Sequence, residues 1–132
     1  MYSRRRPVIV QAELSILGLL KAPAPLLEHQ LLAFGDEEER AVKTAIQWAW
    51  IHRRVKMDQS VAAAHMDIPA PHLSNILNGK KHLPPHKINS FEWICGNRAV
   101  SMTIERFRLI REEQHALVIA RVIVGAQQQA AG

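Results

Sequence analysis

The sequence predicts an all-α protein in which a domain of four to five helices carries an extension at each end. Three observations favour this class. Apolar residues in the middle of the chain recur at three- and four-residue steps, the period of a helix that packs on one side. Aromatic residues make up only 5% of the chain, a low share for a β-rich protein. Capping and stop residues bound the apolar segments at lengths typical of helices.

Residues 1–35 are predicted to form an N-terminal extension. Residues 11–20 and 26–34 can each form a short helix, since two prolines separate them and Gly35 stops the second. Three arginines before the first apolar stretch suggest a secretory signal, but polar residues interrupt that stretch and no convincing cleavage site follows. The chain is therefore expected to be cytoplasmic, which agrees with a single cysteine that cannot form an internal disulfide.

A strong helix is predicted to begin at Asp36 and to open a domain over residues 36–98. Glu39 stands three positions after Asp36, which gives a capping-box-like pattern. The acidic residues 37–39 also suit the positive end of the helix dipole. The apolar positions of this helix recur at helical spacing and predict a buried face, formed by Val42, Ala45, Ile46, Ala49, Trp50 and Val55.

Two short helices are predicted next, over residues 59–66 and 70–78. Asp58 is suited to cap the first of them. Residues 67–69 include a proline and break the helical pattern. Gly79 stands where the second short helix is expected to end in a left-handed conformation.

A fourth helix, over residues 85–95, is predicted to complete the domain. Residues 99–132 then form a C-terminal extension. A long helix over residues 101–126 is preferred there, although residues 116–124 contain enough β-branched side chains to form a strand. The three tryptophans of the chain fall on apolar helical faces, which favours packing in the core over stacking on bases.

The net charge of +5 is concentrated in the middle of the chain. Residues 52–98 hold seven Lys and Arg against three acidic residues, a net charge of +4, together with five of the seven histidines. Residues 1–51 are neutral overall, and residues 99–132 contribute +1. A basic segment is the electrostatic footprint of a nucleic-acid-binding protein, although many domains carry this charge without such a partner.

One segment, residues 58–79, has the sequence DQSVAAAHMDIPAPHLSNILNG. Ala62 and Ala63 supply the small side chains that two short helices need where they cross. Asp67 occupies the turn position that must often be left-handed, which Asp tolerates. The segment resembles the helix-turn-helix of the phage-repressor-like family of bacterial and phage transcriptional regulators. The resemblance extends more loosely over residues 36–97 and covers neither extension.

This resemblance implies sequence-specific binding of double-stranded DNA by a transcriptional regulator. The positions that would face bases in the major groove are Ala70, Pro71, His72, Ser74 and Asn75. The positions suited to phosphate contacts are Gln59, Asn78, Lys80 and Lys81. Ala70 and Pro71 offer no side-chain donors, so direct readout falls on the three polar residues of the first group. Asn75 is the strongest of them because an amide can pair bidentately with adenine.

Other classes of site find little support in the sequence. There is no pair of carboxylates, no nucleophile–base pair and no Gly-rich phosphate loop, so no catalytic residue is predicted and the chain is not expected to be an enzyme. His82, His86 and Cys95 are too loose a group for zinc. No metal and no cofactor are therefore expected.

The C-terminal extension is predicted to mediate self-association into a homodimer. Within residues 104–124, several apolar side chains are too numerous to leave exposed in one patch, namely Ile104, Phe107, Leu117 and Val118. No apolar run has the length needed to cross a bilayer, so no membrane contact is expected. The alternative function is a protein-interaction module, such as an antitoxin or adaptor, which binds a protein partner through its C-terminal segment.

Overall fold

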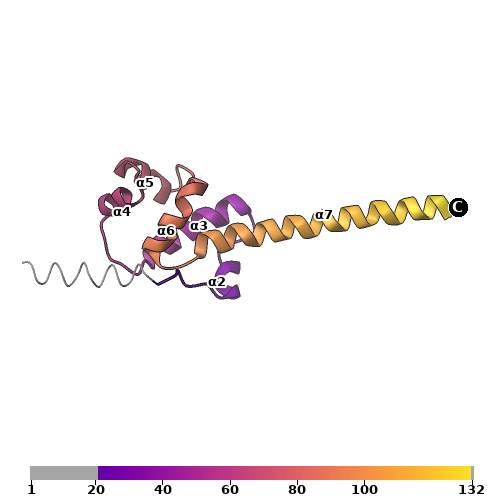
Figure 1. The fold of residues 1–132 in the computed structure, drawn as a ribbon, viewed down its shortest axis with the longest axis horizontal. Coiled ribbons are helices and arrows are strands. Elements are labelled where there is room, and N and C mark those ends of the chain that lie inside the picture. Colours follow the sequence, from indigo (N-terminus) through magenta and orange to yellow (C-terminus); the bar gives the residue numbers. More distant parts are fainter. Residues whose placement is uncertain (1–20, 132) are drawn as a thin grey trace, which may run out of the picture.

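The computed structural model describes residues 21–131. Over these residues helices are the regular secondary structure and no strand is formed (Figure 1), which confirms the predicted all-α class. The helices in chain order are α2 (Glu28–Leu32), α3 (Glu38–Ile51), α4 (Gln59–His65), α5 (Ala70–Leu77), the 3-10 helix η1 (Pro85–Lys87), α6 (Ile88–Cys95) and α7 (Ala99–Ala131). The helix predicted over residues 11–20 lies outside the described residues.

The start of α3 differs from the prediction. Asp36 was expected to cap this helix, but the N-cap is Glu37 and no side chain caps the helix by a hydrogen bond. Gly35 turns the chain just before this point at a φ of 109°. The Asp36 carboxylate instead lies 3.5 Å from the guanidinium of Arg106 in α7. The acidic residue therefore connects α3 to a helix distant in the sequence.

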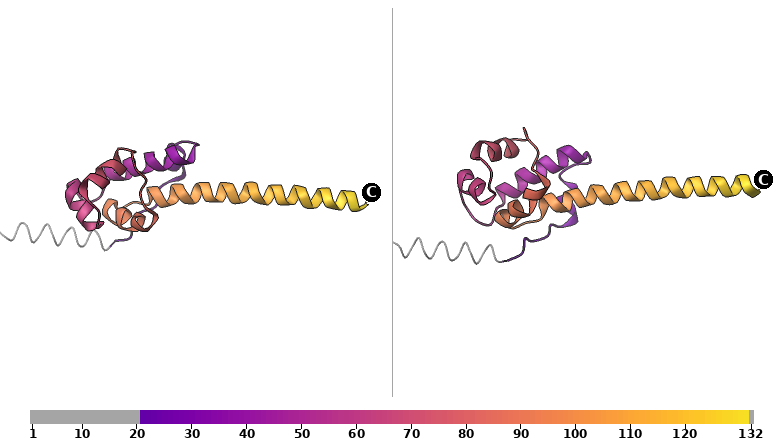
Figure 2. Two further views of the ribbon diagram at one scale, coloured as in Figure 1. Left: turned by 90° about the horizontal axis from the view of Figure 1, so that it is seen from above. Right: turned by 45° about the horizontal axis from the view of Figure 1, so that its top comes forward.

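The C-terminal extension is one continuous helix of 33 residues, α7. This result settles the alternative left open for residues 116–124, which are helical. The first turns of α7 pack mainly on α3, with Val100, Thr103 and Phe107 buried. Arg111 still pairs with Glu38 of α3, and after this point the helix leaves the other elements and projects as a straight rod (Figure 2).

The hydrophobic core is wider than residues 36–98. Leu26 and Phe34 from the N-terminal side are buried in it, and so are Val100 and Phe107 of α7. Ile104 packs against the same core. These positions of α7 share one helical face, because they recur at three- and four-residue steps. Phe107 and Ile104, which were expected to contribute to self-association, thus serve the domain itself.

The tryptophans cover the edge of the core. Trp48 and Trp50 are half-buried and pack against it, as predicted. Trp93 is also half-buried, and the guanidinium of Arg54 lies 5.6 Å from the centre of its ring. A second arginine, Arg53, lies 4.2 Å above the ring of Trp50. Cation–π contacts of this kind stabilise the connection between α3 and α4.

The joint between α6 and α7 is cross-linked by hydrogen bonds. The buried carboxylate of Glu92 accepts bonds from the backbone N–H and the hydroxyl of Ser101, at 2.9 and 2.8 Å. Gly96 is left-handed at a φ of 76°. Its carbonyl accepts a 2.9 Å bond from Ala24, whose own carbonyl accepts one from Arg98. The segment before α2 is thereby held against the start of α7.

Candidate nucleic-acid interface

Helices α4 and α5 are joined by a tight turn over residues 66–69. Asp67 has a φ of 55° and is the one residue other than glycine with positive φ in the described part of the chain. The left-handed turn predicted at this position is confirmed. The turn is closed by backbone bonds from Asp67 to Ala64 and from Ile68 to Ala63, at 3.1 and 3.0 Å. Pro69 then precedes α5 in an extended conformation, as its N-cap.

Small side chains let the two helices approach closely. Ala62 and Ala63 of α4 are fully buried, and Leu73 and Ile76 of α5 pack in the same core. Both helices begin at the predicted residues and end one residue earlier than predicted. The inward residues of α5 therefore fix which of its side chains point outward.

The outer face of α5 is defined by the helical period. Leu73, Ile76 and Leu77 point into the core. At 3.6 residues per turn, the opposite side is centred on Pro71, Asn75 and Asn78, which are four and three residues apart. Pro71 and Asn78 are exposed and Asn75 is half-buried.

The remaining residues predicted to read bases lie on the flanks of this face. Ala70 is exposed, and His72 and Ser74 are half-buried. Among the described residues, no hydrogen bond engages the side chains of His72, Ser74, Asn75 or Asn78. Their polar groups are available to an external partner.

The loop after α5 is tied to the helix through the backbone. Gly79 is left-handed at a φ of 75°, as predicted. The N–H groups of Lys80 and Lys81 both donate to the Asn75 carbonyl, at 2.8 and 3.2 Å. Both lysine side chains are exposed. The backbone of the two lysines is thereby held at the C-terminal end of α5.

Gln59 is exposed at the first position of α4. No hydrogen bond links its side chain to another residue within the described range. Gln59 therefore does not brace α5 by a direct hydrogen bond, and its side chain is available for the predicted phosphate contact. The end of α5 is instead braced by Gln47 of α3, whose side-chain amide donates to the Leu77 carbonyl at 3.2 Å.

Lys43 adds a third cation beside the loop. Its side chain lies next to Gly79: a Cβ atom added to this glycine would be 3.7 Å from Lys43 Cδ. Its ammonium group lies 3.3 Å from Glu39, which also lies 4.0 Å from His82. The basic loop is therefore bounded on one side by the acidic first turn of α3. The sequence does not indicate that Lys43 or Gln47 belongs to this site, because both reach it only through the packing of α3 against α5.

The loose group of His82, His86 and Cys95 is not gathered into a site. The two histidines are exposed, whereas Cys95 is buried at the end of α6. Burial raises the pKa of the Cys95 thiol to about 12, so this group is a neutral thiol at neutral pH. Within residues 21–131, no three His, Cys, Asp or Glu side chains are grouped to hold a metal ion. No helix in the same range has the length and apolar character required to span a membrane.

Comparison of the chain with protein-family models, with curated protein sequences and with solved structures finds no match. The inference of function therefore depends on the geometry of α4, α5 and the loop that follows them.

Proposed function

We propose that the chain binds double-stranded DNA sequence-specifically, as a transcriptional regulator of bacterial or phage type. In this proposal α4 and α5 form a helix-turn-helix of the phage-repressor-like kind, and α5 enters the major groove. One observation carries the proposal. The left-handed turn at Asp67 sets two short helices against each other so that α5 presents a polar face outward, next to two exposed lysines whose backbone is bonded to α5.

The outer face of α5 has the chemistry that base edges require. A major groove admits one α-helix and presents a distinct pattern of donors and acceptors for each base pair. The Asn75 amide matches the N6 and N7 groups of adenine, and His72 and Ser74 can each donate and accept. Ala70 and Pro71 are limited to apolar contact, for example with a thymine methyl group.

The surroundings of α5 have the chemistry that phosphates require. Lys80 and Lys81 offer two exposed ammonium groups at one end of the helix, and Asn78 offers an exposed amide beside them. Gln59 stands exposed at the start of α4. Contacts to phosphates set the position of a protein on the duplex without reading its sequence.

Selection of bound sequences from a random pool of duplex DNA tests the proposal. We expect a short motif to be enriched, with a conserved adenine in it. A pool that stays unenriched after repeated rounds overturns sequence-specific binding.

The alternative function is a protein-interaction module such as an antitoxin or adaptor. For such a module the affinity for DNA should depend little on salt. A DNA-binding protein instead loses affinity steeply as the salt concentration rises, because counterion release becomes less favourable.

Replacing Lys80 and Lys81 together by alanine is expected to weaken binding to all DNA sequences to a similar degree. Each ammonium group that neutralises a phosphate releases about one counterion, so the slope of log K against log salt should become shallower by roughly two. Fluorescence anisotropy on the selected site and on a scrambled site, over a range of salt, measures both effects. Loss of affinity for the selected site alone would mean that these lysines read bases.

A further inference from the structure

The part of α7 beyond Phe107 carries apolar side chains that the rest of the described chain leaves uncovered. Eight large ones are 37–66% exposed: Leu109, Ile110, Leu117, Val118, Ile119, Val122, Ile123 and Val124. Both views in Figure 2 place the C-terminal portion of α7 away from the other helices. Because a single soluble chain rarely exposes so large an apolar patch, the rod is expected to have a partner.

The apolar side chains surround the helix on all sides. Residues 116–126 contain one charged residue, Arg121, and no other polar side chain. At 3.6 residues per turn, Leu117, Val118 and Ile123 point in three widely separated directions. A helix that is apolar all round is normally buried all round, so one partner helix would not cover it.

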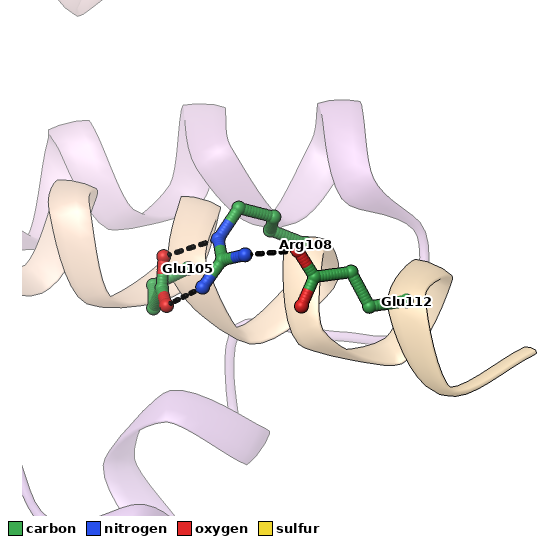
Figure 3. Close-up of polar contacts among 3 residues, drawn as sticks. All are labelled: Glu105, Arg108 and Glu112. Carbon is green, nitrogen blue, oxygen red and sulfur yellow. Dashed lines mark hydrogen bonds and ion pairs between the residues drawn. The ribbon is translucent and has the colours of Figure 1, made fainter. Parts of the chain in front are cut away.

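The charged residues of α7 point to what the partner is. Arg106 pairs with Asp36, and Arg111 pairs with Glu38. Arg108 lies between Glu105 and Glu112 and pairs with both (Figure 3). Of the seven charged residues of α7, two remain without an ion-pair partner among residues 21–131, and they are Glu113 and Arg121.

We propose that α7 packs against α7 of other copies of this chain, antiparallel and centred on Leu117. Glu113 and Arg121 each stand four residues from Leu117, on either side of it. In this register Arg121 of one copy therefore lies level with Glu113 of its neighbour. A parallel alignment would instead place Arg121 beside Arg121, where like charges repel within an apolar layer.

The apolar residues select the same register independently. Antiparallel helices centred on Leu117 place Ile110 level with Val124 of the neighbouring copy, since each is seven residues from the centre. The exposed apolar stretch from Leu109 to Val124 is then overlapped along almost its whole length. Charge complementarity and apolar overlap thus lead to one alignment.

An antiparallel pair of α7 helices leaves the apolar side chains on one side of each helix exposed. Ile119 and Val122, which are 45% and 66% exposed, point away from the side that carries Leu117. Two antiparallel pairs that pack through these residues form a four-helix bundle, a common closed arrangement of identical helices. The partner is therefore three further copies of the chain.

This inference does not rest on the proposed function. Figure 1 places α4 and α5 on the side of the domain away from the free end of α7, so assembly leaves the outer face of α5 accessible. A lipid surface fits the rod less well. A helix that lies on a bilayer buries one face only, whereas the apolar side chains of α7 point to all sides. No helix within the described residues is long and apolar enough to cross a membrane.

Sedimentation equilibrium of the full-length chain, over a range of concentrations, tests the proposal. We expect a particle of four chains. Arg121→Glu and Glu113→Arg, each alone, should raise the concentration of half-assembly by about tenfold or more, because like charges then face each other. The double variant E113R/R121E has the composition of the original chain and should restore assembly. Within one helix these residues are eight positions apart, so restoration requires contact between copies.

Circular dichroism checks that each variant keeps its helical content. A chain that sediments as a single copy, or as two, overturns the four-helix bundle. Failure of the double variant to restore assembly overturns the antiparallel register. Co-flotation of the wild type with vesicles of mixed neutral and anionic lipid, combined with a single-copy mass in solution, would assign the rod to lipid instead.

Discussion

Substitution of Gly96 by alanine is expected to destabilise the domain by about 2–4 kcal/mol, whereas the same substitution at Gly79 should cost only about 1 kcal/mol. The two glycines have nearly the same backbone conformation, with φ of 76° and 75°. The cost of placing an L-residue in the left-handed region is therefore shared by both variants. Any difference between them comes from what the added methyl group meets.

The surroundings of the two glycines differ sharply. A Cβ at Gly79 would meet Lys43 at an ordinary 3.7 Å. A Cβ at Gly96 would lie 2.3 Å from Cδ and 2.9 Å from Cβ of Arg54. Arg54 cannot move without loss, because its guanidinium donates to the Trp93 carbonyl at 2.7 and 3.1 Å and to the Lys21 carbonyl at 2.6 Å. Hydrogen bonds from a charged donor are worth about 1.5–3 kcal/mol each.

Urea unfolding at one fixed protein concentration measures the free energy of unfolding of both variants. The fixed concentration matters because self-association would make the apparent stability depend on it. In an Arg54→Ala background the difference between the two glycine variants should shrink, since most of the obstructing side chain is gone. Equal losses at Gly96 and Gly79 in the original chain would contradict the steric explanation.

Local features of this fold could be predicted from the sequence, because they depend on residues close to one another in the chain. The left-handed turn at Asp67 and the left-handed end at Gly79 follow from what single residues tolerate. The starts of α4 and α5 follow from the apolar period and from the proline between them. The inward positions of α5 follow from the same period, and the outward positions follow from those.

Features that depend on distant parts of the chain could not be predicted. The apolar period of α7 predicts that Phe107 is buried, but it does not predict that Phe107 packs against α3 and the core of the domain. Asp36 has the residue type of a helix cap, yet the approach of Arg106 from α7 gives it another contact. In the candidate site, Gln47 holds the end of α5 through a bond between residues 30 positions apart. No local pattern encodes such a bond.

Replacement of Asn75 by alanine is expected to cost about 1–3 kcal/mol of binding free energy on the preferred DNA site. Asn75 lies at the middle of the outer face of α5, and its amide makes no hydrogen bond to another described residue. The amide is therefore available to pair with N6 and N7 of one adenine. Non-specific binding should change little, because the phosphate contacts proposed for Lys80 and Lys81 would remain.

Asn78→Ala is the matched control for this substitution. Asn78 has the same side chain on the same outer face, one turn further along, but it follows the last residue of α5 and lies next to the lysine loop. It is expected to contact phosphate, so its loss should weaken binding to all sequences alike. The measurement is a set of affinities for all four bases at each position of the selected site, for the original chain and both variants, at one salt concentration.

The pattern of loss across sequences identifies what Asn75 does. If it reads adenine, discrimination relaxes at one base position in each half-site and the other positions keep their preferences. A uniform loss over every sequence would instead mean that Asn75 supports the fold or touches phosphate, as Asn78 is expected to do. An unchanged set of affinities would mean that His72 and Ser74 on the flanks of α5 determine the specificity, or that the shape and deformability of the duplex do so. The carbonyl of Asn75 holds Lys80 and Lys81 through bonds that alanine preserves, so a change confined to specificity would belong to the amide alone.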